Sequence, residues 1–227
     1  MAPRVVEPGG GAYDGAMVTE FPRRMIAPVS TFALALAMGL GAVSSGPSAA
    51  FAQAKVAPSA SRASQAAALW ELLQAPHPQV DGQALRRIGP DVRDLLIETA
   101  TSSRIEAPVR LRALGWLQWY PSTASRAVLM EALRARQASV ATMRVALRAL
   151  AVGFGAESLP TLGEYLVHRD VYVREAAAYA LGDIDDPKAA AVLQDRLERE
   201  PDLTPRDAIV ASLQRHADRT AARKNQR

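Results

Sequence analysis

The sequence lacks cysteine and is poor in aromatic residues and histidine. None of its 227 residues is Cys, three are His, and aromatic residues make up 5% of the chain. The absence of cysteine excludes disulfides, thiolate metal sites and lipid attachment through cysteine. Hydrophobic residues still make up 49%, so the apolar content is mostly Ala, Leu and Val. Because Ala and Leu lose little side-chain entropy in a helix, this composition favours an all-α protein.

Motifs that would indicate catalysis are missing as well. No two of His77, His168 and His216 have the H-x-x-x-H spacing of a helical zinc site. The chain has neither a G-x-S-x-G nucleophile elbow nor a P-loop. An acidic turn at 183–186 lacks the rest of an EF-hand loop. We therefore expect no catalytic residue, no cofactor and no metal site, and the chain is predicted not to be an enzyme.

Charged residues of both signs are interspersed along the chain. It contains 27 Lys and Arg and 23 Asp and Glu residues, which gives a net charge of +4. No long basic run precedes the C-terminal residues 218–227, which are predicted to form a basic disordered tail. The mixed charge favours a protein partner and argues against nucleic acid.

The N-terminal region has the three parts of a secretory signal peptide. Arg23 and Arg24 precede an apolar run over residues 31–43, and a Gly/Ser/Pro break follows. Ala50 and Ala52 then form a small-x-small cleavage pattern. The apolar run is shorter than the roughly 20 residues that a spanning helix needs.

We therefore predict a signal peptide over residues 1–52, with Met17 as an alternative true start. Cleavage after Ala52 would leave Gln53 as the first mature residue, followed by a flexible linker over residues 53–64. These features are typical of an exported bacterial protein, periplasmic or secreted. The alternative is an uncleaved membrane anchor, and only in that case is a membrane expected as a partner.

The rest of the chain repeats with a period of about thirty residues. Arginines recur at differences of 34, 30 and 32 in residue number: Arg110, Arg144, Arg174 and Arg206. Leucines recur at differences of 33, 33 and 31: Leu96, Leu129, Leu162 and Leu193. Two sets that share one period predict two helices per repeat, each with the apolar spacing of an amphipathic helix.

Turn and capping residues place the expected helices in a domain over residues 65–217. Gly, Pro and Asp mark the breaks, and Asp170 and Asp202 are predicted N-caps. The first helices are expected at 107–119, 139–151, 171–182 and 204–215, and the second helices at 123–135, 156–168 and 187–199. An irregular entry segment, which suits a capping repeat, is expected at 65–74, 83–89 and 91–102.

The unit that begins at Asp170 resembles HEAT-like repeats of the phycobilisome-lyase type. It reads Asp170-x-x-Val173-Arg174-x-x-Ala177-x-x-Ala180-Leu181-Gly182, then Ile184, Asp186-Pro187 and Ala189. The resemblance extends over roughly residues 105–215 and implies an α-solenoid of about four antiparallel helix pairs. It implies a scaffold shared by unrelated functions, and a bilin lyase-like enzyme is one alternative that it leaves open.

Two sets of residues are candidates for function. The recurring arginines 110, 144, 174 and 206 are predicted to brace the repeats, by pairing with an acid or a loop carbonyl of a neighbouring repeat. Binding of an anionic partner by these arginines is the alternative. A candidate partner surface comprises one aromatic residue and the exposed positions of the second helices: Trp119, Glu131, Arg134, Glu164, Asp195 and Glu198.

The function predicted from the sequence is a non-catalytic protein–protein interaction scaffold, or adapter, of the cell envelope. Two alternatives stay open, the lyase-like enzyme and a membrane-anchored sensor domain.

Overall fold

The computed structural model describes residues 61–76, 78 and 80–226. The chain divides into two units, Met1–Ala54 and Lys55–Arg227, and all described residues belong to the second. The predicted signal peptide, its cleavage residues Ala50, Ala52 and Gln53, and most of the predicted linker therefore lie outside the described residues.

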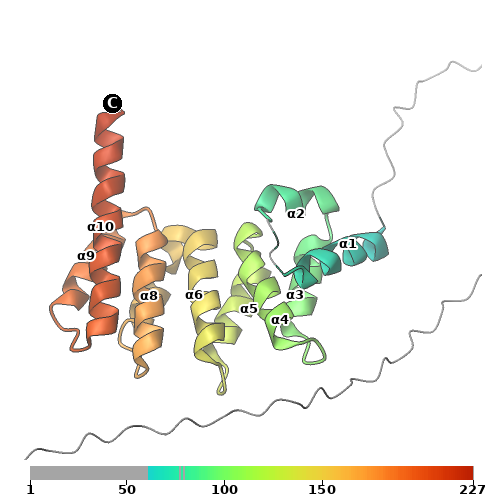
Figure 1. Cartoon of the computed structure of the whole chain (residues 1–227), viewed down its shortest axis with the longest axis horizontal. Coiled ribbons are helices and arrows are strands. Elements are labelled where there is room, and N and C mark those ends of the chain that lie inside the picture. The colour runs from blue at the N-terminus through green and yellow to red at the C-terminus, as the bar shows by residue number, and fades with distance from the viewer. Residues whose placement is uncertain (1–60, 77, 79, 227) are drawn as a thin grey trace, which may run out of the picture. The chain divides into compact units, whose positions relative to one another are not determined.

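Every regular element among the described residues is a helix (Figure 1). In chain order they are α1 (Arg62–Gln74), α2 (Gly82–Ile88), α3 (Val92–Thr101), α4 (Ala107–Trp116), η1 (Leu117–Trp119), α5 (Thr123–Arg134), α6 (Val140–Phe154), η2 (Gly155–Ser158), α7 (Leu159–Tyr165), α8 (Val171–Asp183), α9 (Pro187–Leu197) and α10 (Leu203–Asn225). The ten helices expected from the repeat pattern correspond one for one to α1–α10, and most of their ends agree within a few residues once η1 is counted with α4 and η2 with α7.

Short polar side chains fix where most of these helices begin. The side chains of Ser122, Ser139, Asp170 and Asp186 each accept a hydrogen bond from a backbone N–H in the first turn of the following helix. Such a bond satisfies a donor that has no partner inside the helix. Asp202, predicted as an N-cap, makes no capping bond with its side chain and instead accepts from Arg174.

The first helices of successive repeats stack in a row. α4 contacts α6, α6 contacts α8, and α8 contacts α10. The second helices α5, α7 and α9 each pack against the first helix that follows them in the chain. The loops that lead from a second helix into the next first helix lie along one edge, at the bottom of Figure 1. This arrangement is consistent with an α-solenoid.

The recurring leucines form the core of this stack. Leu96, Leu129, Leu162 and Leu193 are all 0% exposed, which confirms that the second pattern in the sequence marks buried positions. A single helix pair cannot enclose such residues, so they become buried only when neighbouring pairs pack on both sides.

Small residues let α8 approach its neighbours closely. Ala177 and Ala180 are at most 1% exposed. A Cβ placed on Gly182 would lie 2.5 Å from Ser212 Oγ and 2.7 Å from Ser212 Cβ on α10. These distances are shorter than van der Waals contact, so only glycine fits at this crossing.

The predicted domain limits are wrong at both ends. α1 begins at Arg62, inside the predicted linker, because Ser61 Oγ accepts a hydrogen bond from the backbone N–H of Ser64 and caps the helix. α10 continues to Asn225, through most of the predicted disordered tail. Two arginines of the tail anchor this helix: Arg219 donates to the carbonyl oxygens of Gly182 at the end of α8 and of Ile184 in the following turn, and Arg223 pairs with Asp185 in that turn.

One described segment, Val140–Tyr165, is long and apolar enough to cross a membrane by length and composition alone. It comprises α6, η2 and α7, and α6 ends where Gly155 adopts a φ of 53°. Leu147 and Leu150 of α6 are at most 1% exposed. A buried core helix has this same composition, and the packing of α6 between α4 and α8 accounts for it.

Gly182→Ala is expected to lower the free energy of unfolding by about 1–3 kcal/mol, because the added methyl group overlaps Ser212. Gly163→Ala is the matched control, since a Cβ at Gly163 meets nothing within 4 Å. It should leave stability unchanged or raise it by about 0.5–1 kcal/mol, the helix preference for Ala over Gly. Urea unfolding followed by circular dichroism measures both, and equal effects of the two substitutions would contradict the packing described.

Candidate interaction surface

Arg174 holds together two loops on the lower edge of the stack. Its Nη1 donates to the carbonyl oxygen of His168, at the end of the preceding second helix, at 2.9 Å. Its Nε and Nη2 donate to the two carboxylate oxygens of Glu200 at 3.0 and 2.9 Å. Arg174 is therefore joined to the loop before its own repeat and to the loop before the next one.

Glu200 is the buried partner in this arrangement, with a side chain that is 0% exposed. It also accepts from Arg196 Nη2 at 2.5 Å and from the backbone N–H of Asp202 at 3.2 Å. Burial by itself would raise the pKa of Glu200, but the hydrogen bonds from Arg174 and Arg196 outweigh it, so the pKa lies below its usual range. The carboxylate is therefore charged and fully bonded.

The other three recurring arginines make contacts that differ from those of Arg174. Arg206 Nη1 donates to the carbonyl oxygens of Leu197 and Glu200 at 3.1 and 2.9 Å. Arg144 forms an exposed ion pair with Glu175 of α8 at 2.9 Å. The side chain of Arg110 makes no hydrogen bond or ion pair within the described part of the chain, and its buried Nε has no partner.

Arg112, which the repeat pattern did not single out, takes a bracing role near Arg110. Its Nη1 donates to the carbonyl oxygens of Leu73 and Ala75, at the end of α1, at 2.5 and 2.6 Å. The repeat pattern did not single out Glu200 either. Its only distinguishing feature in the sequence is its position six residues before Arg206, and the other repeats have no acidic residue six positions before their recurring arginine.

The acidic turn at 183–186 is neutralised by arginines. Asp183 pairs with Arg215 at 3.1 Å, and Asp185 pairs with Arg223. The side chain of Asp186 accepts from the backbone N–H of Lys188 at 2.7 Å and caps α9. No group of three or more His, Cys, Asp or Glu side chains that could hold a metal ion occurs among residues 61–76, 78 and 80–226.

His216 lies buried between α10 and the end of α8. Its Nε2 is 3.2 Å from the carbonyl oxygen of Leu181, and its Nδ1 is 3.2 Å from Nη2 of Arg219. A carbonyl can only accept and a guanidinium can only donate, so Nε2 carries the proton and the ring is neutral. Burial above all, together with the charges of Arg219 and Arg215, lowers the pKa of His216.

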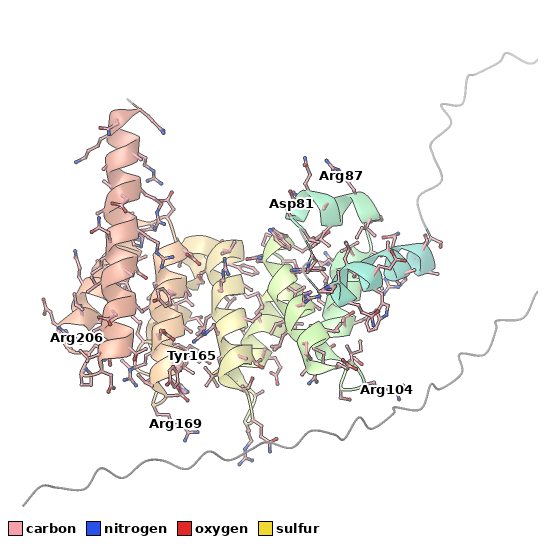
Figure 2. All side chains as sticks on the ribbon, viewed as in Figure 1. Asp81, Arg87, Arg104, Tyr165, Arg169 and Arg206 are labelled. Atoms are coloured by element: carbon pink, nitrogen blue, oxygen red, sulfur yellow. The ribbon has the colours of Figure 1, made fainter. Side chains whose placement is uncertain are left out.

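The predicted partner surface divides into an exposed set and one covered residue. The exposed set lies on the second helices α5, α7 and α9 and at their ends: Glu131, Arg134, Glu164, Asp195 and Glu198. α5 and α7 lie side by side, because Tyr165 (labelled in Figure 2) donates its hydroxyl to the carbonyl oxygen of Leu133 at 3.2 Å. Asp195 pairs with Arg199 on the surface.

Trp119 is less exposed than the other residues of the predicted partner surface. It is half-buried, and its ring centroid lies 6.3 Å from that of Trp116. A Cβ on Gly82 would come within 2.9 Å of the Trp119 ring, so α2 packs directly on it. The repeat pattern did not show this contact with the entry segment, and partner contact by Trp119 stays a prediction.

Open grooves interrupt the surface of the described residues, and two of them are larger than 800 Å³. One, of about 870 Å³, lies between α3, α4, α5 and the start of α6, and Arg110, Leu111, Val128 and Glu131 are among its lining residues. The other, of about 900 Å³, lies between α9 and α10, with Ala190, Leu213 and Ala217 in its lining. Small and apolar side chains make up most of the first lining, whereas the second combines apolar side chains with polar and charged ones.

The fold and this surface define a class of protein: an all-helical repeat stack with open grooves. Residues 135–214, which run from the end of α5 into α10, match the family model described as HEAT repeats. Together with the helical arrangement, this match supports a HEAT-repeat protein. No curated protein matches the chain.

Glu200→Gln is expected to lower the free energy of unfolding by about 3 kcal/mol, because it removes the buried carboxylate that Arg174 and Arg196 share and leaves Arg174 paired with the partly exposed Asp202 alone. Asp195→Asn removes an exposed pair and should cost less than about 1 kcal/mol. Thermal unfolding of the two variants at pH 7 measures the difference. A cost for Glu200→Gln no larger than that for Asp195→Asn would show that the buried pair does not brace the stack.

His216 is expected to make the protein less stable as the pH falls below about 6.5, the ordinary pKa of histidine. Its folded pKa is lowered, so the unfolded chain binds a proton first and is favoured as protons are added. The melting temperature should therefore fall between pH 7.5 and 5.5, and His216→Gln should reduce that slope. An unchanged slope in the variant would exclude His216 as the group responsible.

Proposed function

We propose that this chain is a non-catalytic interaction scaffold of the cell envelope that binds a protein partner. HEAT repeats generally mediate protein–protein interaction. The single observation that carries the proposal is the presence of two open grooves of about 870 and 900 Å³ on the described helices. Grooves between helices that are lined by small apolar residues accept side chains or a short segment of another protein.

The exposed charges of the second helices support a protein partner. Glu131, Glu164 and Glu198 lie on the same set of helices as Arg134, so the surface carries both signs. A surface for nucleic acid would instead carry mainly basic residues. Mixed exposed charges increase the rate of association and restrict the choice of partner.

Location in the envelope rests on the N-terminal sequence, with its arginine pair, apolar run and Ala50-Phe51-Ala52 pattern. The lyase-like alternative rests on family resemblance alone, and the sensor alternative requires an uncleaved N-terminus. No side-chain arrangement among the described residues favours either of them, and both stay alternatives to the proposal.

The test is recovery of the tagged full chain from the envelope fraction of its own cells. N-terminal sequencing should begin at Gln53, and mild crosslinking should capture a partner above a tag-only control. The double variant Glu164→Lys and Glu198→Lys should reduce capture roughly five- to thirtyfold, since each reversed surface charge costs about 0.5–1 kcal/mol.

Glu71→Lys is the matched control for that measurement, because Glu71 is exposed on α1, away from the second helices of the later repeats. It should leave capture unchanged. A protein recovered only from the cytoplasm would contradict the envelope location, and capture no higher than the tag-only control would contradict the scaffold.

A further inference from the structure

Arg110 stands at the wall of the groove between α3, α4, α5 and α6 without a partner. The side chain is half-buried, and its Nε is shielded from solvent. It makes no hydrogen bond or ion pair to any other described residue, whereas Arg144, Arg174 and Arg206 all do. A guanidinium that is partly shielded from water and has no partner within its own chain is well suited to bind an anionic group of another molecule.

The last repeat shows what such an arginine binds when a partner is present. Arg174 lies four residues after Asp170, the N-cap of α8, and Arg110 lies four residues after Glu106, at the N-cap position of α4. The two arginines therefore occupy the same place in their helices. Arg174 is held by the carboxylate of Glu200, through Nε and Nη2 at 3.0 and 2.9 Å.

The matching loop beside Arg110 has no carboxylate to offer. Glu200 lies two residues before the N-cap of α10, and the residue two before the N-cap of α6 is Gln137. The whole α5–α6 loop, residues 135–139, reads Ala-Arg-Gln-Ala-Ser. Glu131 is the acid in the groove lining, and it forms no ion pair with Arg110.

We propose that this groove binds a carboxylate-bearing segment of a partner protein. The proposal rests on the proposed scaffold function and names the chemistry of one of its sites. An Asp, Glu or C-terminal carboxylate of the partner accepts from Arg110 in the way that Glu200 accepts from Arg174. Neighbouring small or apolar side chains of the partner fill the groove against Leu111, Leu114 and Val128.

The dimensions and the lining suit an extended segment of a few residues. A groove of about 870 Å³ is within the range of sites that enclose ligands of this size. Gln137, Ser139 and Thr142 also line it and can bond the backbone of such a segment. Arg110 fixes the position of the carboxylate, because a planar guanidinium donates two parallel hydrogen bonds to the two oxygens of a carboxylate.

The first experiment pans a random decapeptide display library against the folded full chain. Sequences enriched on the wild type should share an acidic residue, or a free C-terminus, next to small apolar residues. Arg110→Gln should abolish that enrichment, and the fold should survive because the side chain bonds to no other described residue. Arg87→Gln, which removes an exposed charge of α2 outside the groove lining and outside the candidate partner surface, should leave the enrichment intact.

The second experiment supplies the missing carboxylate from within the chain. Gln137→Glu changes one side chain of the lining into an acid at the register of Glu200, without altering its size. It should pair with Arg110, raise the melting temperature and reduce binding of the enriched peptides at least tenfold. Tighter or unchanged binding by Gln137→Glu, enrichment that survives Arg110→Gln, or enriched peptides without an acid would each overturn the proposal.

These outcomes are separate from a failure of the scaffold itself. If the partner captured from the envelope binds Arg110→Gln as well as the wild type and the library yields no acidic motif, the groove proposal fails and the scaffold stands. If nothing is captured from the envelope, the scaffold fails, and the library result still decides whether the groove binds carboxylates.

Discussion

The packing of one helix pair on the next is the constraint on which the rest of this structure depends. Leu129, Leu162 and Leu193 lie on the second helices, and each is wholly buried only because a neighbouring repeat covers it. The small residues at the crossing of α8 and α10 follow from the same requirement, because close approach excludes even a Cβ at Gly182. Since each repeat contacts mainly its neighbours, local differences between repeats can accumulate without loss of the fold.

The arginine register shows such a difference. The recurring arginines of the first helices make different contacts. Arg174 binds a carbonyl oxygen and a buried carboxylate, and Arg206 binds two carbonyl oxygens. Arg144 forms an exposed ion pair, and Arg110 is unpaired among the described residues. For Arg174 and Arg110, the loop that follows the second helix of the repeat accounts for the difference. Where that loop carries Glu200, the arginine is internally satisfied; where it carries only Arg136 and neutral residues, the arginine remains available to another molecule.

At the C-terminal end, ion pairs and hydrogen bonds hold α10 against the last complete helix pair, α8 and α9. The carbonyls and acids at the end of α8 are bound by Arg215, Arg219 and Arg223 of α10. Positive side chains at a helix C-terminus are stabilised by the helix dipole. The basic residues that gave the tail the composition of a solvated segment are thus the ones that hold it in place.

The sequence by itself determined the helical class, the repeat period and the buried leucines, because each depends on local propensity and on spacing along one chain. It also placed the exposed charges of the second helices correctly, since helical periodicity alone separates Glu131 and Glu164 from Leu129 and Leu162. Only the tertiary structure decided that Trp119 is covered by α2, that Glu200 is buried beside Arg174 and that Arg110 has no partner. Those outcomes depend on which loop of a different helix reaches the side chain, and distance along the sequence carries no information about that.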